Sequence, residues 1–315
     1  MQPEVVTFGE SMALFMPAAG RGIERAASLD KGFGGAESNV AIGLARLGHK
    51  AGWFGKLGAD PLGTYILKSI RGEGVDVSRA RQSADGPTGL MLRERAGGRS
   101  SVYYYRRGSA MSRMTPDDLD PAYIAGARLL HVTGITMALS ESCRRTVEEA
   151  VRIAREHGVK VSFDPNLRLK LWSVEEAREA ILPLAGRADY FLPGLDELKL
   201  LLATDDLDRI LQYLHGLGTV TVLKGVGGEN WIVEGGRVTK VPFVPVERVV
   251  DTVGAGDAFC AGFLSGILSG KSLEEAVRLG NLLGALAVQT EGDWEGLPTR
   301  DEVEEALGQR RHVER

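Results

Sequence analysis

The most informative segment of this 315-residue chain reads Asp251-Thr252-Val253-Gly254-Ala255-Gly256-Asp257-Ala258-Phe259. It joins a turn of residues with almost no side chain to the start of an apolar helix. The backbone N–H groups of Gly254, Ala255 and Gly256 can therefore approach an anion closely, and the positive end of the helix dipole strengthens the attraction. Asp257 lies in the first helical turn, beside any anion bound there. The combination predicts a phosphate site with a carboxylate base next to it, as phosphoryl transfer requires.

The same segment also fits a plain glycine turn with an ordinary acidic residue in the first turn of a helix. Short motifs of this kind occur by chance, so the segment alone does not separate the two interpretations. The order of strands and helices around it, and a second glycine motif, are needed to decide.

Short β-branched runs alternate with amphipathic helical segments along most of the chain. The expected strands cover residues 5–8, 129–132, 159–163, 190–192 and 220–223. The expected helices cover residues 36–47, 61–73, 142–157, 174–185 and 206–217. This order predicts an α/β fold of three layers, with helices on both faces of a mainly parallel central sheet. Ligands of such a sheet gather beyond the carboxyl ends of its strands.

Two segments interrupt the alternation, residues 12–35 and 87–108. Both contain strand-like residues and no helix long enough for a crossover. The second has Gly97-Gly98 at a hairpin turn, followed by the β-prone run Tyr103-Tyr104-Tyr105. We expect the two segments to form a small β-sheet lid on a single domain spanning residues 1–315. Its open strand edges predict pairing with another subunit, and hence a homo-oligomer.

Composition narrows the class of partner. The chain has 38 basic and 42 acidic residues, and the net charge of −4 gives no attraction to nucleic acid or to anionic membranes. Two cysteines, Cys143 and Cys260, are too few for a disulfide scaffold or a cysteine-rich metal site. The first residues lack the basic region of a signal peptide, and no apolar run is long enough to span a bilayer. We therefore expect a cytoplasmic protein with a small-molecule ligand.

A second glycine motif, Gly34-Gly35-Ala36-Glu37-Ser38-Asn39, leads into a helix rich in alanine and leucine. Gly34 and Gly35 allow a polyhydroxyl ligand to approach the backbone at the helix start. Asn39 can hydrogen-bond hydroxyl groups there. This motif and the 251–257 segment stand in the order in which the PfkB family has its two signature motifs. The chain therefore resembles the ribokinase-like carbohydrate kinases of that family, from its first strand to about residue 293.

That resemblance implies a ribokinase-like fold and ATP-dependent phosphorylation of a sugar hydroxyl. Asp257 would be the base, and the amides of Gly254, Ala255 and Gly256 would form the anion hole. The run Asp164-Pro165-Asn166-Leu167-Arg168 and the segment from Tyr103 to Ala110 are similar to the 2-keto-3-deoxygluconate kinases of the family. This similarity implies a substrate that is a sugar acid.

Four side chains are expected to bind that sugar acid. Arg168 suits bidentate binding of the substrate carboxylate. Tyr103 and Tyr105 share one strand face by the period of 2, and both hydroxyls would point from the lid onto the substrate. Asp293 matches a carboxylate that contacts the sugar in the similar kinases. The alternatives are lid packing or a subunit contact for the tyrosines, a structural ion pair for Arg168 and a plain loop acid for Asp293.

The nucleotide site is expected to follow the strand at residues 220–223. The sequence Lys224-Gly225-Val226-Gly227-Gly228-Glu229 resembles the ATP-binding loop of the family, with Lys224 near the nucleotide. The resemblance also implies nucleotide contacts for Asn166, Arg168 and Asn281. A helical asparagine such as Asn281 is otherwise typical of a surface.

The same resemblance also implies bound metal ions. Glu197 is expected to position Mg²⁺ through water, although Gly194 stands where the family usually has an asparagine. Asp251 and Thr252 resemble residues near a monovalent-cation site in relatives, so such a cation is a possible further cofactor.

These observations predict a kinase that uses ATP and Mg²⁺ to phosphorylate the terminal hydroxyl of 2-keto-3-deoxygluconate. The nearest alternative is a fructokinase or ribokinase that acts on a neutral sugar. A third interpretation is a sugar- or nucleotide-binding sensor without catalysis. The presence of Asp257 beside the glycine turn argues against the sensor.

Overall fold

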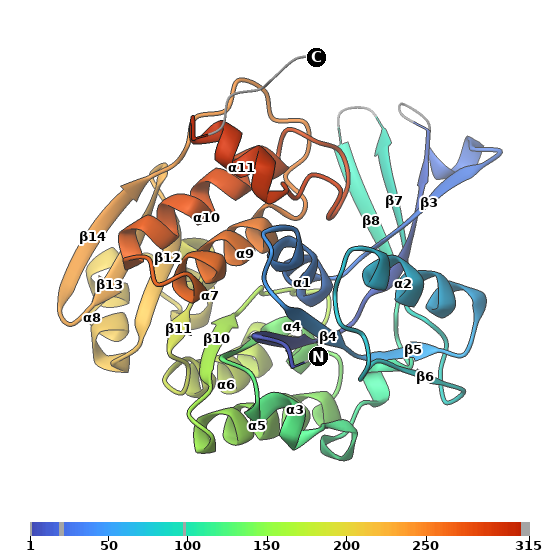
Figure 1. The fold of residues 1–315 in the computed structure, drawn as a ribbon, viewed down its shortest axis with the longest axis horizontal. Helices are drawn as coiled ribbons and strands as arrows, with labels where there is room; N and C mark the ends of the chain where they lie inside the picture. The colour runs from blue at the N-terminus through green and yellow to red at the C-terminus, as the bar shows by residue number, and fades with distance from the viewer. Residues whose placement is uncertain (1, 19–21, 97–98, 310–315) are drawn as a thin grey trace.

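The large sheet forms the centre of the molecule in the computed structural model, which describes residues 2–18, 22–96 and 99–309 (Figure 1). Within these residues its eight strands run in the order β14 (Arg237–Pro242), β13 (Glu229–Glu234), β12 (Val220–Val226), β11 (Tyr190–Phe191), β10 (Lys160–Asp164), β9 (Leu129–Thr133), β1 (Val5–Phe8) and β4 (Ala51–Phe54).

The strands from β12 to β4 are parallel to one another, whereas β13 is antiparallel to both β12 and β14 and forms a hairpin with β14 at one edge. The mainly parallel sheet expected from the sequence is therefore confirmed. Strand β4 and the hairpin were not expected. The β4 sequence Ala51-Gly52-Trp53-Phe54 contains a glycine and has little β-branched character, so propensity alone does not reveal it.

Helices cover both faces of the sheet (Figure 1). One face carries α1 (Ala36–Arg46), α9 (Ala255–Leu268), α10 (Leu273–Ala287) and α11 (Arg300–Ala306), with α2 (Pro61–Gly72) in the same core. The other face carries α3 (Pro121–Ala125), α4 (Gly134–Ala138), α5 (Glu141–Glu156), α6 (Val174–Ala185), α7 (Leu195–Leu202) and α8 (Leu207–Leu217).

Neighbouring residues of one strand pack into opposite cores. Val5 packs in the core with α1 and α9, and Val6 packs in the core with α3 and α5; both side chains are fully buried. A strand buried on both faces reads as a continuous apolar run, which is how β1 was recognised. No helix in the described part of the chain has both the length and the apolar character needed to cross a membrane.

Local capping signals define several helix starts. Ser173, Ser272 and Thr299 each form a capping box at the start of α6, α10 and α11. Asp60 caps α2 by accepting a hydrogen bond from the Gly63 N–H group at 2.8 Å. These starts follow from short sequence motifs, which explains why the helices lie close to their expected positions.

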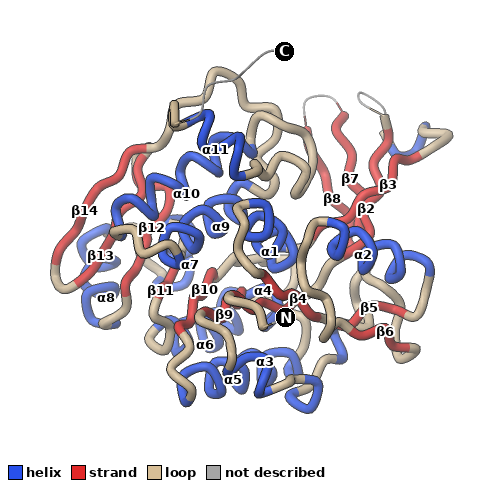
Figure 2. Tube along the Cα trace, viewed as in Figure 1, coloured by secondary structure: helices blue, strands red, loops and turns tan. Residues whose placement is uncertain are grey.

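A second, four-stranded sheet projects from the large one (Figure 2) and is called the small sheet below. Its order is β3 (Leu29–Gly34), β2 (Met12–Pro17), β7 (Leu90–Ala96) and β8 (Arg99–Tyr105). The strands lie in the two segments where the sequence favours strands without helices. Strand β2 is antiparallel to β3 and parallel to β7, and β7 is antiparallel to β8. The expected Gly97-Gly98 turn lies outside the described residues.

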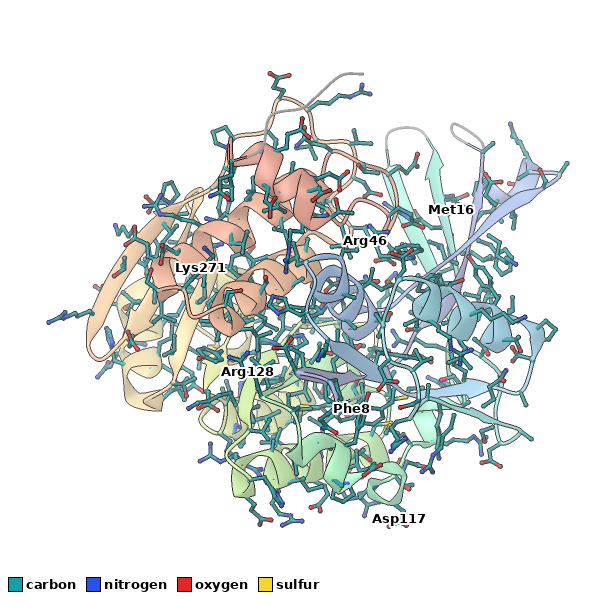
Figure 3. The ribbon with its side chains drawn as sticks, in the orientation of Figure 1. Phe8, Met16, Arg46, Asp117, Arg128 and Lys271 are labelled. Atoms are coloured by element: carbon teal, nitrogen blue, oxygen red, sulfur yellow. The ribbon has the colours of Figure 1, made fainter. Side chains whose placement is uncertain are left out.

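One face of the small sheet has its own apolar cluster of Met12, Leu14 and Met91, against which Met16 and Val102 pack. Met16 extends from β2 in Figure 3. The cluster is small, so the position of this sheet also depends on polar contacts with the main body.

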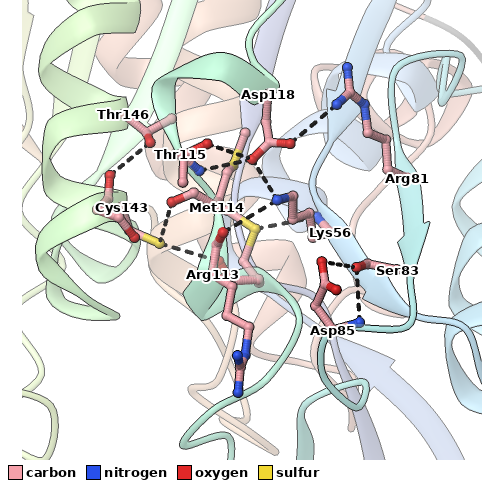
Figure 4. A network of polar contacts seen from close by, with 12 residues as sticks. Lys56, Arg81, Ser83, Asp85, Arg113, Met114, Thr115, Asp118, Cys143 and Thr146 are labelled. Atoms are coloured by element: carbon pink, nitrogen blue, oxygen red, sulfur yellow. Dashed lines mark hydrogen bonds and ion pairs between the residues drawn. The ribbon is translucent and has the colours of Figure 1, made fainter.

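A polar network joins the main body to a third, two-stranded sheet of β5 (Lys56–Gly58) and β6 (Arg81–Ser83) (Figure 4). Lys56 Nζ lies 2.6 Å from Asp118 Oδ2, and Arg81 Nη1 lies 3.2 Å from Asp118 Oδ1. Burial alone would raise the pKa of Asp118, but the hydrogen bonds from Lys56 and Thr115 and the charge of Lys56 together outweigh it and lower the pKa. The carboxylate therefore stays charged and holds β5 and β6 against the segment before α3.

Candidate active site

A cavity of about 1150 Å³ lies between the small sheet and the carboxyl ends of the parallel strands. On the strand side it is lined by Glu10 after β1, Ile135 after β9, Asp164 at the end of β10 and Gly194 after β11. The opposite wall is the face of the small sheet that carries Met12, Leu14, Met91, Arg93 and Val102. This is the edge at which the sequence predicts ligands.

The glycine turn at the start of α9 opens onto this cavity. Gly254 is the N-cap of the 14-residue helix and has a φ of 75°. A Cβ atom at this position would also overlap the backbone oxygen of Asp293, so only glycine fits. Gly254, Gly256 and Asp257 line the cavity, whereas the Ala255 N–H group donates a long hydrogen bond, 3.4 Å, to the Thr252 carbonyl. The positive end of α9 thus faces the space beside Asp257.

Asn39 joins two carboxylates in the cavity wall. Its Nδ2 atom donates to Asp257 Oδ2 and to Asp293 Oδ1, both at 2.8 Å. Gly34 lies directly against Asp293, and any side chain at position 34 would overlap the Asp293 carboxylate. The first and last thirds of the chain therefore meet in this cluster, and each glycine motif supplies part of it.

Both carboxyl groups have raised pKa values. Asp257 borders the cavity, yet the atoms around its carboxyl group exclude enough water to raise its pKa to about 8. The negative charge of Asp293 adds to this shift, and the Asn39 hydrogen bond opposes it. Burial also raises the pKa of Asp293, to about 6. A carboxyl group that titrates near neutral pH suits proton transfer.

Arg46, a residue of α1, holds the segment that carries Asp293. Arg46 Nη1 donates to the Leu297 carbonyl at 2.5 Å, and its guanidinium lies 5.2 Å from the centre of the Trp294 ring. Arg46 is labelled in Figure 3, beside the loop that follows α10. The Trp294 ring packs against Phe33 with 4.9 Å between ring centres. The position of Asp293 is thus supported by aromatic packing and by backbone hydrogen bonds.

A second charged group lies at the ends of β10 and β12. Lys224 Nζ donates to Asp164 Oδ2 at 2.9 Å, and the Cys260 thiol lies 3.3 Å from the same oxygen. Burial alone would raise the pKa of Asp164, but the charge and hydrogen bond of Lys224, with smaller contributions from His131 and Cys260, together outweigh it and lower the pKa. Lys224 is therefore a fixed positive charge at the cavity wall.

Glu197 lies beside this pair and also lines the cavity. Its two carboxylate oxygens accept hydrogen bonds of 2.6 Å from the N–H groups of Leu167 and Gly194. Burial raises the pKa of Glu197, and the charge of Asp164 adds to the shift. Carboxylate oxygens suit Mg²⁺, and the described residues hold no cluster of three or more acidic, histidine or cysteine ligands. This donor set fits a Mg²⁺ ion that is held mainly by phosphates and water.

Arg168 points into the cavity from the loop after β10. This loop turns at Asn166, which also lines the cavity and has a φ of 39°. Arg168 is exposed, and it forms no ion pair with any residue that the structure describes. The alternative of a structural ion pair is therefore wrong. Its positive charge lowers the pKa values of Asp257 and Asp293 and so opposes their upward shifts.

The expected orientation of Tyr103 and Tyr105 is wrong. Tyr104 lines the cavity, and it pairs across the sheet with Met91, which lines the cavity as well. Residues next to each other on a strand point to opposite faces, so Tyr103 and Tyr105 face away and are 48% and 63% exposed. The Tyr103 hydroxyl donates to Glu94 at 3.0 Å. Three consecutive tyrosines carry no alternation, so their face could not be read from them alone.

Sequence reasoning assigned no role to several charged residues at the small-sheet end of the cavity. Arg106 binds Glu10 through Nε at 2.6 Å, and its guanidinium lies 5.8 Å from the centre of the Tyr104 ring. Lys170 lies 5.5 Å from the same ring and donates to the Val102 carbonyl at 3.1 Å. The alternation of Val102, Tyr104 and Arg106 along β8 and beyond was the available signal.

The remaining residues of the expected nucleotide site form a turn between β12 and β13. Gly225, Gly227 and Gly228 have φ values of 81°, 59° and 88°. Glu229 accepts a hydrogen bond of 3.0 Å from the Trp231 indole. Of the described residues 224–229, only Lys224 lines the cavity, and the glycines lie beside it.

Asn281 is buried rather than exposed. It donates to the Pro242 carbonyl at 2.8 Å and accepts from the Asn230 amide at 2.7 Å. The surface alternative for this residue is therefore wrong. Its hydrogen bonds join α10 to the β13–β14 hairpin, next to the glycine turn.

Known proteins resemble the chain over nearly its whole length. The 2-dehydro-3-deoxygluconokinase of Bacillus subtilis (strain 168) is 44% identical, over 99% of this chain and 98% of that protein. The probable fructokinase-7 of Arabidopsis thaliana is 34% identical, over 98% of this chain and 93% of that protein. The crystal structure of a 2-dehydro-3-deoxygluconokinase from Thermotoga maritima matches with a TM-score of 0.84 and 27% identity, over 98% of this chain and 99% of that one.

The family model of the pfkB family carbohydrate kinases matches residues 2–300. This range contains both glycine motifs and every side chain that lines the cavity. The relatives confirm the ribokinase-like α/β fold expected from the sequence. The chain belongs to the pfkB family of carbohydrate kinases.

Proposed function

We propose that this kinase transfers the terminal phosphoryl group of ATP to the terminal hydroxyl of 2-keto-3-deoxygluconate, also called 2-dehydro-3-deoxygluconate. The observation that carries the proposal is the cluster of Asn39, Asp257 and Asp293 at the start of α9, in one cavity with the unpaired Arg168. The name of the Bacillus subtilis relative supports the same substrate.

Asp257 is the base in this proposal. Its raised pKa, about 8, lets it take the proton of an alcohol as the phosphoryl group arrives. The amides of Gly254, Ala255 and Gly256 and the positive end of α9 stabilise the charge on the transferred group. Because these groups are fixed before substrate binds, little reorganisation is needed during the reaction.

The sugar acid is held at two ends. Asn39 and Asp293 hydrogen-bond the hydroxyl groups near Asp257, and Gly34 and Gly35 let the ligand approach the backbone. Arg168 binds the carboxylate at the other end, where Tyr104 from the small sheet contacts the substrate. A neutral sugar has no carboxylate that could pair with the Arg168 guanidinium.

The nucleotide lies on the β12 side of the cavity in this proposal. Lys224 and Asn166 contact its phosphates, and the turn of Gly225, Gly227, Gly228 and Glu229 lies along the nucleotide with Asn281 behind it. When bound, Mg²⁺ reduces the negative charge on the transferred phosphoryl group. Glu197 would hold this ion through water molecules.

We further propose that the small sheet is a lid and that its outer face contacts a second copy of this chain. Tyr103 and Tyr105 project from that face and are exposed, and the half-buried Leu92 on β7 lies opposite Tyr103. An exposed face of this kind favours protein–protein contact. The two buried thiols and the small-molecule substrates agree with a cytoplasmic enzyme.

The experiment that tests the substrate is a parallel assay of ADP formation with 2-keto-3-deoxygluconate, 2-keto-3-deoxygalactonate, fructose and ribose. We expect kcat/KM to be highest for the sugar acids, because only they use the charge of Arg168. A preference for fructose or ribose would contradict the proposal and favour the neutral-sugar alternative. Binding of ligands without ADP formation from any sugar would support the sensor.

A further inference from the structure

An ion pair connects the small sheet to the glycine turn. Arg93, on β7, places its Nη2 atom 2.6 Å from Asp251 Oδ1. The two side chains are only 4% and 3% exposed. They come from segments more than 150 residues apart, so the contact depends on the small sheet being in place.

Asp251 holds the backbone on both sides of the catalytic cluster. Its Oδ1 atom accepts a hydrogen bond of 3.1 Å from the Val253 N–H group, one residue before the N-cap of α9. Its Oδ2 atom lies 3.5 Å from the Gly292 nitrogen, one residue before Asp293. A single carboxylate therefore connects the turn that carries Asp257 with the turn that carries Asp293.

A buried carboxylate needs a positive partner to keep its charge and its position. The charge of Arg93 also lowers the pKa of Asp293 and so acts on the cluster itself. Arg93 lines the cavity on the small-sheet side, but its bond to Asp251 points toward the turn rather than toward a ligand.

We propose that Arg93 is a positioning residue that makes the anion-binding turn depend on the small sheet. When the small sheet is in place, Arg93 fixes Asp251, and Asp251 fixes residues 252–254 and 292–293 around Asp257. Binding of the sugar acid against the small sheet then completes the phosphate site. This inference rests on the proposed function, since it assigns a role in the same reaction.

The test compares Arg93→Met, Arg93→Lys, Asp251→Asn and the double variant Arg93→Met/Asp251→Asn. We expect kcat to fall roughly 10–100-fold in Arg93→Met, because a charged hydrogen bond to the turn is lost. The KM for ATP should rise, because the turn binds the phosphates, but by a smaller factor than kcat falls, since the turn matters most in the transition state. Arg93→Lys keeps the charge and should recover part of kcat.

Three readouts separate positioning from general stability. The losses in kcat of the single variants should not add in the double variant, because the two residues act as a unit. Removing both charges should also restore part of the melting temperature lost in Arg93→Met, where the buried Asp251 carboxylate no longer has the charge of Arg93 beside it. In Arg93→Gly, guanidinium at concentrations far below those that denature should restore part of kcat.

The matched control is Lys56→Met. The Lys56–Asp118 ion pair has the same N–O distance, 2.6 Å, and is also largely buried, but neither residue lines the cavity (Figure 4). Its loss should lower the melting temperature and leave kcat unchanged. If Arg93→Met behaves in the same way, with normal kcat, or if the Arg93 and Asp251 effects on kcat are additive, the proposal is overturned.

A measurement that needs no sugar keeps this inference separate from the proposed function. We expect ATP with Mg²⁺ to raise the melting temperature of the wild type more than that of Arg93→Met, because the turn binds the phosphates. Equal shifts would contradict the role of Arg93. If the wild type phosphorylates none of the sugars, the proposed function fails, yet this comparison still reads the effect of Arg93 on the turn.

Discussion

The two walls of the active-site cavity are built in different ways. The wall at the ends of the parallel strands consists of contiguous motifs, such as residues 251–257, attached to strands that are buried on both faces. The wall on the small sheet has a small apolar cluster of its own, and Glu10 and Asp251 hold its arginines by ion pairs. In the proposed function, the first wall would therefore carry the base and Arg168 on a rigid support, whereas the second wall would add Tyr104 and depends on long-range contacts for its position.

The largest expected effect tests the rigid wall. Asp257→Asn removes the base but keeps the size of the side chain, and kcat should fall roughly 10²–10⁴-fold. Because the anion-binding turn remains, the affinity for ATP should change little. The measurement is steady-state kinetics together with nucleotide binding by calorimetry. Turnover near the wild-type rate would exclude Asp257 as the base.

The next effect tests recognition of the acid. Arg168→Ala should lower kcat/KM for 2-keto-3-deoxygluconate roughly 10–100-fold, the usual range for a hydrogen bond between charged groups. The rate with a neutral sugar should hardly change, since no carboxylate is present. Kinetics on both substrates with the same preparation provide the check. Equal losses on both would show that Arg168 acts on the phosphates or on folding instead.

A pair of tyrosine variants tests the assignment of faces on the small sheet. Tyr104→Ala removes a ring from the cavity and should raise the KM for the sugar acid several-fold. Tyr103→Ala, the matched control on the opposite face, should leave this KM unchanged and weaken self-association. Kinetics and light scattering give the two readouts. The reverse pattern would mean that the tyrosines of the outer face reach the substrate.

The pH dependence tests the coupling between the two carboxyl groups. With a pKa of about 8 for Asp257, kcat/KM should rise with pH and level off above this value, because only the ionised base accepts a proton. Asp293→Asn removes a neighbouring negative charge, so the pKa of Asp257 should fall and the rise should move to lower pH. The maximum rate should also drop, since Asp293 contacts the sugar in the proposed function. An unchanged midpoint would exclude electrostatic coupling between the two groups.

The smallest expected effect is on stability. An ordinary aspartate titrates near pH 4, whereas Asp257 titrates at about 8 in the folded protein. The folded state thus holds a proton that the unfolded chain releases, and stability falls as pH rises from about 4 to 8. The Asp257→Asn variant has no carboxyl group at this position, so this fall in stability with pH is absent. Its melting temperature should exceed that of the wild type by a few degrees at pH 9 and by less at pH 5.

The two walls also differ in how far the sequence predicts them. The anion-binding turn and the helix caps depend on residues within a few positions of each other, so local motifs reveal them. The face of β8 depends on the register between Leu14, Met91 and Tyr104: Met91 pairs with Tyr104 on the next strand and with Leu14 on β2, which is distant in sequence. That register is set by tertiary packing, and the expectation for Tyr103 and Tyr105 was wrong for this reason.

Charged contacts between distant segments were missed for a similar reason. The pairs Arg93–Asp251 and Arg106–Glu10 are both buried, and each joins the small sheet or its end to the main body. Nothing in the sequence near either arginine indicates its partner. In contrast, the contact of Asn39 with Asp257 and Asp293 follows once both glycine motifs are placed at the same edge of the sheet.

The most direct test of the account is a crystal structure of the complex with a non-hydrolysable ATP analogue, Mg²⁺ and 2-keto-3-deoxygluconate. We expect the terminal phosphate at the N–H groups of residues 254–256 and the terminal hydroxyl about 2.6–3.2 Å from a carboxylate oxygen of Asp257. A terminal phosphate elsewhere in the cavity, or a hydroxyl out of reach of Asp257, would contradict the account.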